Sequence, residues 1–297
     1  MTPAGRRMPA ASGLVIVDKP AGQTSHDVVA QIRRLAGTRR VGHAGTLDPM
    51  ATGVLVIGVE KATRLLGYLA LTEKEYTGTI RLGQATDTDD ADGVIIAETS
   101  AAAVSQAALE AGAAALTGEI QQVPPGFSAI KVSGKRAYRL AREGAVPELA
   151  ARTVTVSSFT VLAVRRHGDL LDADVAVTCS SGTYIRALAR DLGASLGVGG
   201  HLTALRRIRV GPYRIGQART LEQLAASFTV IGLAEAASVA FRRVNLTEED
   251  ARLVAHGRRL PGAKLGVGPG PVAALAPDGS LIALLTVEAR PLAVFVP

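Results

Sequence analysis

Short apolar runs at uneven intervals constrain this fold more than any other feature of the sequence. Gly13–Asp18 (GLVIVD) and Gly53–Val59 (GVLVIGV) have the length and composition of buried strands. Tyr76–Leu82 alternates with a period of two, and further strands are expected near residues 153–165 and 170–178. Helices interrupt these strands irregularly, and several strands follow one another directly. The pattern predicts a mixed α+β sheet rather than a regular βαβ alternation.

Amphipathic and alanine-rich segments between the strands predict the helices. Ser25 is the expected cap of a helix that stops at Gly37 and carries its apolar residues on one face. Residues 101–117 predict a second helix, and another is expected to begin at Thr183. The opposite face and the exit of the first helix carry four arginines: Arg33, Arg34, Arg39 and Arg40.

The N-terminal segment gives no sign of export or membrane insertion. Residues 1–12 predict a disordered tail that lacks the apolar core of a signal peptide. No segment of the sequence approaches the roughly 20 apolar residues of a membrane span. We therefore expect a cytoplasmic protein without a membrane partner.

The C-terminal part differs in pattern from the rest of the chain. A boundary is expected near 220–240, which leaves a main domain at 13–235 and a small β-rich appendage at 240–297. The appendage has a short helix, a passage rich in Gly and Pro, and two apolar strands. The passage rich in Gly and Pro is Gly262–Pro271, and the two strands are Val272–Ala276 and Leu281–Val287.

Composition excludes several classes of protein. With 47% hydrophobic and 20% charged residues the chain is globular rather than disordered. Its one cysteine, Cys179, excludes an internal disulfide framework and a thiolate zinc site. Gly53–Gly58 lacks the lysine of a phosphate loop, and Thr88 and Thr99 stand where a calcium loop requires acids. We expect no metal and no cofactor.

Charge is distributed unevenly along the chain. The formal net charge is +7, and six of the 33 basic residues are lysine, which leaves 33 − 6 = 27 arginines. Residues 82–130 hold seven acids and no Lys or Arg, whereas 131–166 hold eight basic residues and 201–219 hold five arginines. Such a sided distribution favours a polyanion partner, although composition alone fits an arginine-rich coding bias equally well.

The densest polar cluster is His43-Ala-Gly-Thr-Leu-Asp48-Pro-Met-Ala-Thr-Gly53. Asp48 has two interpretations. It could cap a short helix that begins at Pro49. Alternatively, it is a carboxylate held for chemistry on a loop stiffened by Pro and Gly, and such a group needs a nearby cation to stay ionised if it is desolvated.

Several motifs in a fixed order resemble the TruB family of tRNA pseudouridine synthases. The segment Gly45-Thr-Leu-Asp48-Pro-Met-Ala-Thr-Gly53 resembles the catalytic motif of that family, and Asp18-Lys19-Pro20-Ala-Gly22 resembles its first motif. The match continues through Glu75-Tyr76, Arg81-Leu-Gly83-Gln-Ala-Thr86-Asp87-Thr-Asp89, Pro124-x-x-x-Ser128-Ala129-Ile-Lys131, Cys179-Ser-Ser-Gly182-Thr183-Tyr184-Ile185-Arg186 and His201-Leu-x-x-Leu205-Arg206-Arg207.

The resemblance implies a fold and a reaction. The fold is the pseudouridine synthase fold, a mainly antiparallel central sheet with flanking helices, followed by a PUA-like C-terminal domain. The reaction is isomerisation of the uridine at position 55 in the T-loop of tRNA, without a cofactor. The nucleophile would be Asp48, which either adds to C1′ of the ribose or assists loss of the base to a glycal. The sequence leaves both routes open.

The resemblance also assigns roles around Asp48. Tyr76 matches the tyrosine that lies against the base and helps to remove the C5 proton, and Arg186 matches the arginine that pairs with the nucleophile. Arginine in the first turn of a helix gains nothing from the helix dipole, so Arg186 is expected to have a specific anionic partner. Tyr184 and Leu205 would line the uridine pocket.

Further residues of the resemblance concern the RNA. His43 matches a histidine that enters the T-loop beside the flipped nucleotide. Lys19 and Pro20 match a motif that supports the catalytic loop. The span of residues 124–152 would be an RNA-binding insertion. The expected phosphate contacts are Lys131, Lys135, Arg136, Arg139, Arg142, Arg206 and Arg207. The implied partner is the T-arm of tRNA, and we expect a monomer without an obligate protein partner.

Two other function classes remain open on the sequence. One is an RNA-folding module that unfolds and reanneals the tRNA elbow, a role that can coexist with catalysis. The other is a carboxylate-dependent nucleoside or glycoside hydrolase, which would need a second catalytic carboxylate and would release free base.

Overall fold

The computed structural model describes residues 11–126, 131–132, 135–136, 149–260, 265–266 and 270–296. The chain forms two compact units. Unit 1 comprises Met1–Pro49, Gly53–Leu71 and Val210–Pro297, and unit 2 comprises Met50–Thr52 and Thr72–Arg209. The expected tail at 1–12 lies almost wholly outside the described residues.

The N-terminal strands of unit 1 form an antiparallel sheet. β1 (Gly13–Lys19) lies between β14 (Ile231–Gly232) and β3 (Thr52–Val59), and β2 (Val41–Ala44) also pairs with β3. The register of β1 on β3 runs from Gly13 opposite Val59 to Lys19 opposite Gly53. The two apolar runs of the sequence are therefore neighbouring strands, as their composition predicts.

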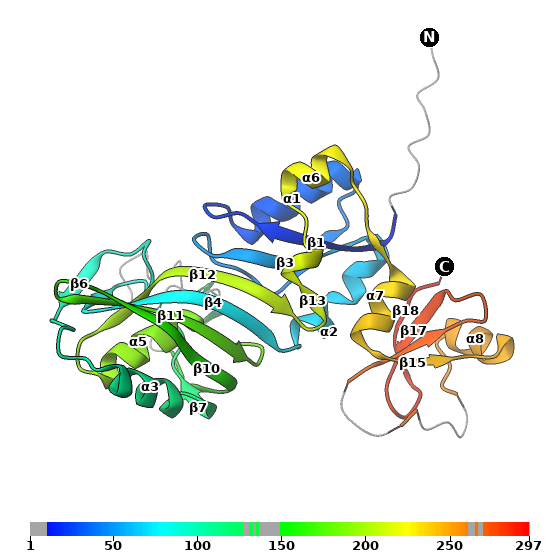
Figure 1. Ribbon diagram of the computed structural model, residues 1–297. Coiled ribbons are helices and arrows are strands. Elements are labelled where there is room, and N and C mark those ends of the chain that lie inside the picture. Colours follow the sequence, from blue (N-terminus) through cyan, green and yellow to red (C-terminus); the bar gives the residue numbers. More distant parts are fainter. Residues whose placement is uncertain are drawn as a thin grey trace, which may run out of the picture. The chain divides into compact units, whose positions relative to one another are not determined.

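Helices cover both faces of this sheet. On one face α1 (Ser25–Ala36) and α6 (Leu221–Ala226) enclose a core that includes Val17, Ile32 and Leu55. The other face packs on η1 (Glu60–Arg64), α2 (Leu66–Ala70) and α7 (Leu233–Ala240). Because both faces are buried, the strands are apolar at nearly every position instead of alternating. Figure 1 shows α1 and α6 side by side.

A second sheet of unit 1 is built from the C-terminal residues. Its order is β15 (Arg242–Asn245), β16 (Val272–Leu275), β17 (Leu281–Leu285), β18 (Pro291–Val294). β15 and β16 are parallel, the other pairs are antiparallel, and α8 (Glu248–Ala255) packs against β17 and β18. The two C-terminal strands and the short helix are confirmed. Most of Gly262–Pro271 lies outside the described residues.

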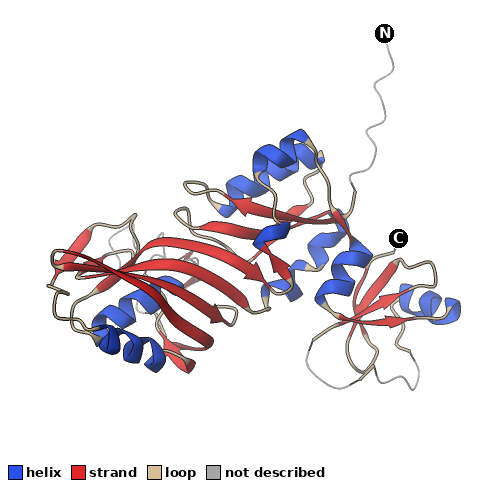
Figure 2. Ribbon diagram, viewed as in Figure 1, coloured by secondary structure: helices blue, strands red, loops and turns tan. Residues whose placement is uncertain are grey.

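The sheet of unit 2 is longer and antiparallel. Its strands follow the order β12 (Gly200–Val210), β4 (Lys74–Leu82), β11 (Leu170–Cys179), β10 (Arg152–His167), β7 (Gly118–Gln122). α3 (Gln106–Ala115) and α5 (Ile185–Ser195) pack together on one face, as Figures 1 and 2 show. The mixed α+β prediction is confirmed.

Shorter elements lie between the main strands along the chain. β5 (Gln84–Thr86) and β6 (Ile95–Glu98) form a hairpin after β4. β8 (Lys131–Val132) and β9 (Lys135–Arg136) form a second short hairpin inside the expected insertion. β13 (Tyr213–Arg214) and η2 (Ile215–Gln217) precede α6.

Three helix starts differ from the sequence prediction, and one of them is α3, which begins at Gln106 rather than at residue 101. The cap of α1 is Thr24 rather than Ser25, because the Thr24 hydroxyl accepts the Asp27 N–H while the Asp27 carboxylate accepts the Thr24 N–H. α5 begins at Ile185 rather than Thr183. The stop of α1 at Gly37 is confirmed, and its φ of 68° is the left-handed conformation that glycine adopts without strain.

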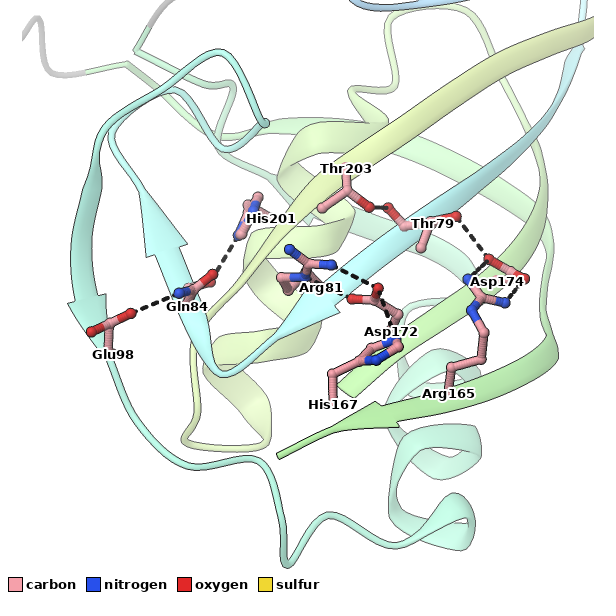
Figure 3. A network of polar contacts seen from close by, with 10 residues as sticks. All are labelled: Thr79, Arg81, Gln84, Glu98, Arg165, His167, Asp172, Asp174, His201 and Thr203. Atoms are coloured by element: carbon pink, nitrogen blue, oxygen red, sulfur yellow. Dashed lines mark hydrogen bonds and ion pairs between the residues drawn. The ribbon is translucent and has the colours of Figure 1, made fainter. Parts of the chain in front are cut away.

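The other face of the unit 2 sheet carries a network of ion pairs, drawn in Figure 3. Arg81 binds both oxygens of Asp172 at 2.8 Å, and Arg165 binds both oxygens of Asp174. Thr79 also donates to Asp174 at 2.7 Å. Hydrogen bonds from Arg81 hold the pKa of Asp172 below its ordinary range, and those from Arg165 do the same for Asp174.

This network predicts a loss of stability in acid. A carboxyl whose pKa is lower in the folded chain contributes fully above its unfolded pKa, and the contribution is lost as pH falls through the folded value. Asp172→Asn should therefore lower the free energy of unfolding at pH 7 by about 1–3 kcal/mol. The difference from wild type should shrink below about pH 4. Urea unfolding at both pH values measures it, and a constant difference would contradict this account.

Candidate active site

The loop that carries Asp48 joins β2 to β3 in unit 1. Residues 45–51 form no helix, so the interpretation of Asp48 as a helix cap is wrong. The loop opens at Gly45, whose φ of 86° strains any residue with a side chain. Asp48 itself is half-buried. Asp48 therefore lies on a loop and not in a helix or strand.

Two buried side chains hold the peptides on either side of Asp48. The Ser25 hydroxyl accepts the Leu47 N–H at 2.9 Å and donates to the Leu47 carbonyl at 3.1 Å. The Lys19 ammonium donates to the carbonyls of Pro49 at 3.2 Å and Pro20 at 2.8 Å. Lys19 is 0% exposed and Ser25 is 1% exposed, so both act from within the protein. This anchoring fixes the backbone before and after Asp48.

A third bond to the loop comes from the backbone of the first family motif. The Gly22 N–H donates to the Pro49 carbonyl at 2.9 Å. Gly22 has a φ of 78°, which explains why glycine follows Pro20-Ala in the sequence. The first motif and the Asp48 motif are therefore in contact, with Lys19 and Gly22 on the same carbonyl.

His43 lies on β2, just before the Asp48 loop, and is half-buried. Its ring meets the ring of His26 edge to face, with centroids 5.6 Å apart and an interplanar angle of 82°. His26 is exposed at the start of α1. Sequence reasoning singled out His43 alone, because a contact between residues seventeen positions apart has no local signal.

The remaining predicted site residues belong to unit 2. Tyr76 is 7% exposed on β4, opposite Val177 of β11. Leu205 is 8% exposed on β12, and its Cδ1 would lie 3.5 Å from a Cβ placed on Gly78. Because Gly78 and Tyr76 are two residues apart on one strand, Leu205 packs on the face that Tyr76 shares. Tyr76 therefore faces inward, on the same side of the sheet as Leu205.

The backbone of Tyr184 is held by a side chain of the sheet. The Gln122 side chain accepts the Tyr184 N–H at 2.8 Å and donates to its carbonyl at 3.1 Å. Gln122 is 0% exposed and ends β7, so the residue that precedes α5 is fixed from the far edge of the sheet. Nothing in the sequence pattern pointed to Gln122.

Arg186 is buried at the start of α5 and has a carboxylate partner within unit 2. Its Nη1 lies 3.3 Å from Asp90 Oδ2 and donates to the Thr88 carbonyl at 2.8 Å. Both side chains of the pair are almost fully buried, at 5% and 6% exposed. The anionic partner that the helix-dipole argument required is thus present, and it includes Asp90, a residue to which the sequence gave no role.

The turn that presents Asp90 is built by the acidic and threonine residues around it. Asp90 Oδ1 accepts from the Thr88 hydroxyl at 2.6 Å and from the Asp92 N–H at 3.1 Å. The Thr86 hydroxyl donates to the Asp90 carbonyl at 2.8 Å. The Thr-Asp-Thr-Asp run therefore serves to aim one carboxylate at Arg186, and this is the signal that identifies Asp90.

The neighbouring Asp89 has an unusual environment. Burial raises its pKa to about 6, against the opposing charges of Arg190 and Arg186. Arg190 lies 3.2 Å from its carboxylate. A perturbed carboxyl also arises in structural ion pairs, and the contact with Arg190 accounts for the position of this one.

The expected RNA contacts differ in how far the structure describes them. Arg206 is half-buried and donates to the Thr52 hydroxyl at 3.2 Å. Arg207 is 1% exposed, which corrects its assignment as a phosphate contact, because a guanidinium enclosed in the protein cannot reach RNA. Arg139 and Arg142, with the helix expected to carry them, lie outside the described residues. Only the backbones of Lys131, Lys135 and Arg136 are described.

The single thiol is not a competing nucleophile. Cys179 is 1% exposed, and burial raises its pKa to about 11. The nearby Lys74 is also buried, which with the charge of Arg207 lowers its pKa to about 8. Within the described part of the chain, no three His, Cys, Asp or Glu residues are grouped to hold a metal ion.

A search of the described helices finds none that is long and apolar enough to cross a membrane.

The predicted site residues therefore fall into two groups. His43, Asp48, Lys19 and Pro20 belong to unit 1, while Tyr76, Tyr184, Arg186, Leu205 and the arginines of β12 belong to unit 2. In each unit the functional side chains sit where strands end or helices begin, and buried polar side chains fix their backbones. Unit 1 holds a carboxylate on a clamped loop, and unit 2 holds a buried arginine with its own carboxylate and an inward tyrosine. Side chains of these types serve acid–base or covalent catalysis.

Comparison with known proteins agrees with this description. Residues 33–185 match the model of the N-terminal domain of the TruB family of pseudouridylate synthases. Residues 186–244 and 241–296 match two C-terminal models of tRNA pseudouridine synthase B or II. The chain belongs to the TruB family.

Relatives cover nearly the whole chain. A protein of Thermobifida fusca named tRNA pseudouridine synthase B is 64% identical over 278 residues, which span 92% of this chain and 94% of the relative. A protein of the same name from an Arthrobacter species is 60% identical over 96% of this chain and 97% of its own. Among solved structures, a chain of a Cbf5–Nop10–Gar1 complex has a TM-score of 0.73 at 28% identity, covering 98% of this chain and 85% of the other.

The anchoring of the Asp48 loop gives a prediction with a matched control. Ser25→Ala leaves both polar groups of the Leu47 peptide without their partner, so it should cost about 1–3 kcal/mol of unfolding free energy and lower turnover. Thr24→Ala removes the cap of the same helix, at about 1 kcal/mol, without touching the loop. Turnover and urea unfolding of both variants should separate them. Equal turnover of the two variants would contradict the role of Ser25.

Proposed function

We propose that this chain converts the uridine at position 55 in the T-loop of tRNA to pseudouridine. The observation that carries the proposal is the anchored loop of Asp48 in a chain of the TruB family. Relatives that match almost the full length bear the name tRNA pseudouridine synthase B. The enzyme is an isomerase, because substrate and product have the same atoms.

Asp48 is the nucleophile in this proposal. The glycosidic bond between N1 and C1′ breaks, the uracil turns within the site, and a bond forms between C5 and C1′. The proton on C5 is lost and N1 gains one, so no oxidant and no cofactor is needed. The carboxylate either bonds to C1′ or takes a proton from the ribose to give a glycal. Tyr76 lies against the base and assists removal of the C5 proton.

Arg186 keeps Asp48 ionised and oriented in this proposal. A guanidinium beside a carboxylate favours the charged form, which is the reactive one. The described contact between Arg186 and Asp90 supports this role, because a buried arginine that is already held by one carboxylate and one carbonyl cannot swing away. Asp90 is thus a positioning residue that acts through Arg186.

The substrate is the T-arm of tRNA, and its uridine must leave the stacked loop to reach the site. Extrusion costs a few kcal/mol, and His43 takes space in the loop beside the flipped nucleotide. Tyr184 and Leu205 line the pocket. The insertion at 124–152, with Arg206 of β12, contacts the RNA backbone. Residues 13–235 form the catalytic domain, and 240–297 form a PUA-like domain.

The remaining expectations belong to the same proposal. The protein works in the cytoplasm as a monomer, without a cofactor or an obligate protein partner. A tRNA-folding role accompanies catalysis, because extrusion of T-loop bases already opens the tRNA elbow.

Asp48→Asn tests the chemistry directly. The variant should lose pseudouridine formation on a T-arm transcript, while the Kd for that transcript changes less than a few-fold, since the side chains are nearly equal in size. Release of tritium from 5-tritiated uridine measures the first, and filter binding the second. Residual turnover above a few per cent would contradict the assignment of Asp48. Retained annealing of tRNA by this variant would show that the folding role is separate.

Two substitutions test the arginine. Arg186→Lys replaces a forked guanidinium with a single ammonium, so kcat should fall with little change in KM. Asp90→Asn keeps the shape of the partner and removes its charge, so kcat should fall by a smaller factor. Wild-type kcat for Arg186→Lys would contradict the paired-carboxylate argument.

A further inference from the structure

The exit of α1 forms a hollow lined by three arginines that the proposed function does not use. The hollow has a volume of about 950 Å³ and is lined by Arg33, Arg34, Gly37, Thr38 and Arg39, which we call the arginine hollow. Arg33, Arg34 and Arg39 are exposed. Among the described residues its lining holds no carboxylate, and the nearest described one, Glu60, accepts a hydrogen bond from Thr38. The chemistry of the hollow suits an anion rather than an apolar partner.

The charges of the hollow are available for a ligand. In the part of the chain that the structure describes, no carboxylate forms an ion pair with Arg33, Arg34 or Arg39. The adjacent Arg40 differs, since it lies 3.7 Å from Glu60. The three arginines of the hollow thus keep their positive charge available, whereas the charge of the adjacent Arg40 is balanced by Glu60.

One of the three arginines is already positioned. Arg33 Nη2 donates to the Val41 carbonyl at 3.1 Å, at the start of β2. This bond ties the end of α1 to the strand that carries His43. It leaves the remaining N–H groups of the guanidinium for a second acceptor, because arginine has five donors.

The hollow lies along the same pair of elements as the two histidines. Contacts of Arg33 with Val41 and of His26 with His43 show that α1 and β2 run side by side in opposite directions. The seven residues from His26 to Arg33 correspond to about 10 Å of helix. This path is long enough to lie beside several phosphates of one RNA strand.

We propose that the arginine hollow binds the phosphodiester backbone of the T-arm, on the strand that leads away from the flipped nucleotide beside His43. This inference rests on the proposed function for the identity of the RNA. Guanidinium groups bind phosphate through two parallel hydrogen bonds, and a row of them reads backbone position without reading sequence. The arginine hollow thus sets the register of the RNA on unit 1.

A simpler role for these arginines predicts a different result. Cations at the end of a helix are stabilised by its dipole, and Arg33 and Arg34 lie in the last turn of α1. If that were their whole purpose, their removal would lower stability and leave RNA binding unchanged. The two roles are therefore separated by measuring both quantities on the same variants.

The test uses the full chain and a T-arm hairpin transcript. Arg34→Ala/Arg39→Ala leaves Arg33 on its Val41 carbonyl, so the contact between α1 and β2 is retained. The matched control is Arg34→Lys/Arg39→Lys, which keeps both charges. Kd is measured at several salt concentrations, and urea unfolding verifies that each variant is folded.

The alanine pair should raise Kd about tenfold or more at 0.1 M salt. Its slope of log K against log salt should fall by about 1.4 to 1.8, because each phosphate contact contributes about 0.7 to 0.9. The lysine pair should keep the wild-type slope. Ethylation of phosphates beside the target uridine should weaken binding of wild type but not of the alanine pair.

A slope and Kd equal to wild type in the alanine pair would overturn the proposal, whether the hollow then serves the helix end or an acidic protein. Failure of the proposed function is a separate outcome. If the wild-type chain forms no pseudouridine, the salt slopes still decide whether the arginine hollow binds RNA.

Discussion

The proposed site depends on the hydrogen bonds that anchor the backbone on either side of Asp48. The loop with Asp48 has no helix or strand of its own, so its conformation must be imposed by contacts. The buried hydroxyl of Ser25 makes two hydrogen bonds to the backbone of one residue, Leu47, and the buried ammonium of Lys19 binds the Pro49 carbonyl just beyond Asp48. An unsatisfied buried ammonium would be costly, so Lys19 and the loop carbonyls stabilise each other. The Asp48 loop is thereby held by side chains that are themselves enclosed in the protein.

Unit 2 applies the same principle to Arg186. Its guanidinium is buried. The cost of burial is offset by the ion pair with Asp90 and by the hydrogen bond to the Thr88 carbonyl. The turn that supplies Asp90 is in turn held by threonine hydroxyls. Buried polar neighbours thus hold both the Asp48 loop and the Arg186 guanidinium. Preorganisation of this kind is what a reaction with a single carboxylate and no cofactor requires.

Sequence reasoning predicted the elements well because their signals are local. The apolar runs became β1 and β3, the alternation at Tyr76 became β4, and Gly37 ended α1. The choice between Ser25 and Thr24 failed because two adjacent hydroxyls both suit a cap. The Ser25 hydroxyl binds the backbone of Leu47, which is distant in the sequence, and this leaves Thr24 as the cap. Gln122, Asp90 and the contact of His26 with His43 were likewise missed, because each joins residues from separate elements.

Roles of residues depended on the resemblance more than on physics. The composition is basic, and the structure shows that the arginines differ in exposure. Arg207 is enclosed in the protein, while Arg33, Arg34 and Arg39 line a hollow. Burial cannot be read from a run of arginines, since alternate residues of a strand face opposite sides.

The central claim is that this chain isomerises one uridine rather than releasing it. The most direct measurement is incubation of an unmodified tRNA transcript with the wild-type chain, followed by mapping of pseudouridine and assay of free uracil. The account predicts pseudouridine at position 55 and no free base. Release of uracil, or a transcript that remains unmodified under conditions where it is bound, would contradict it.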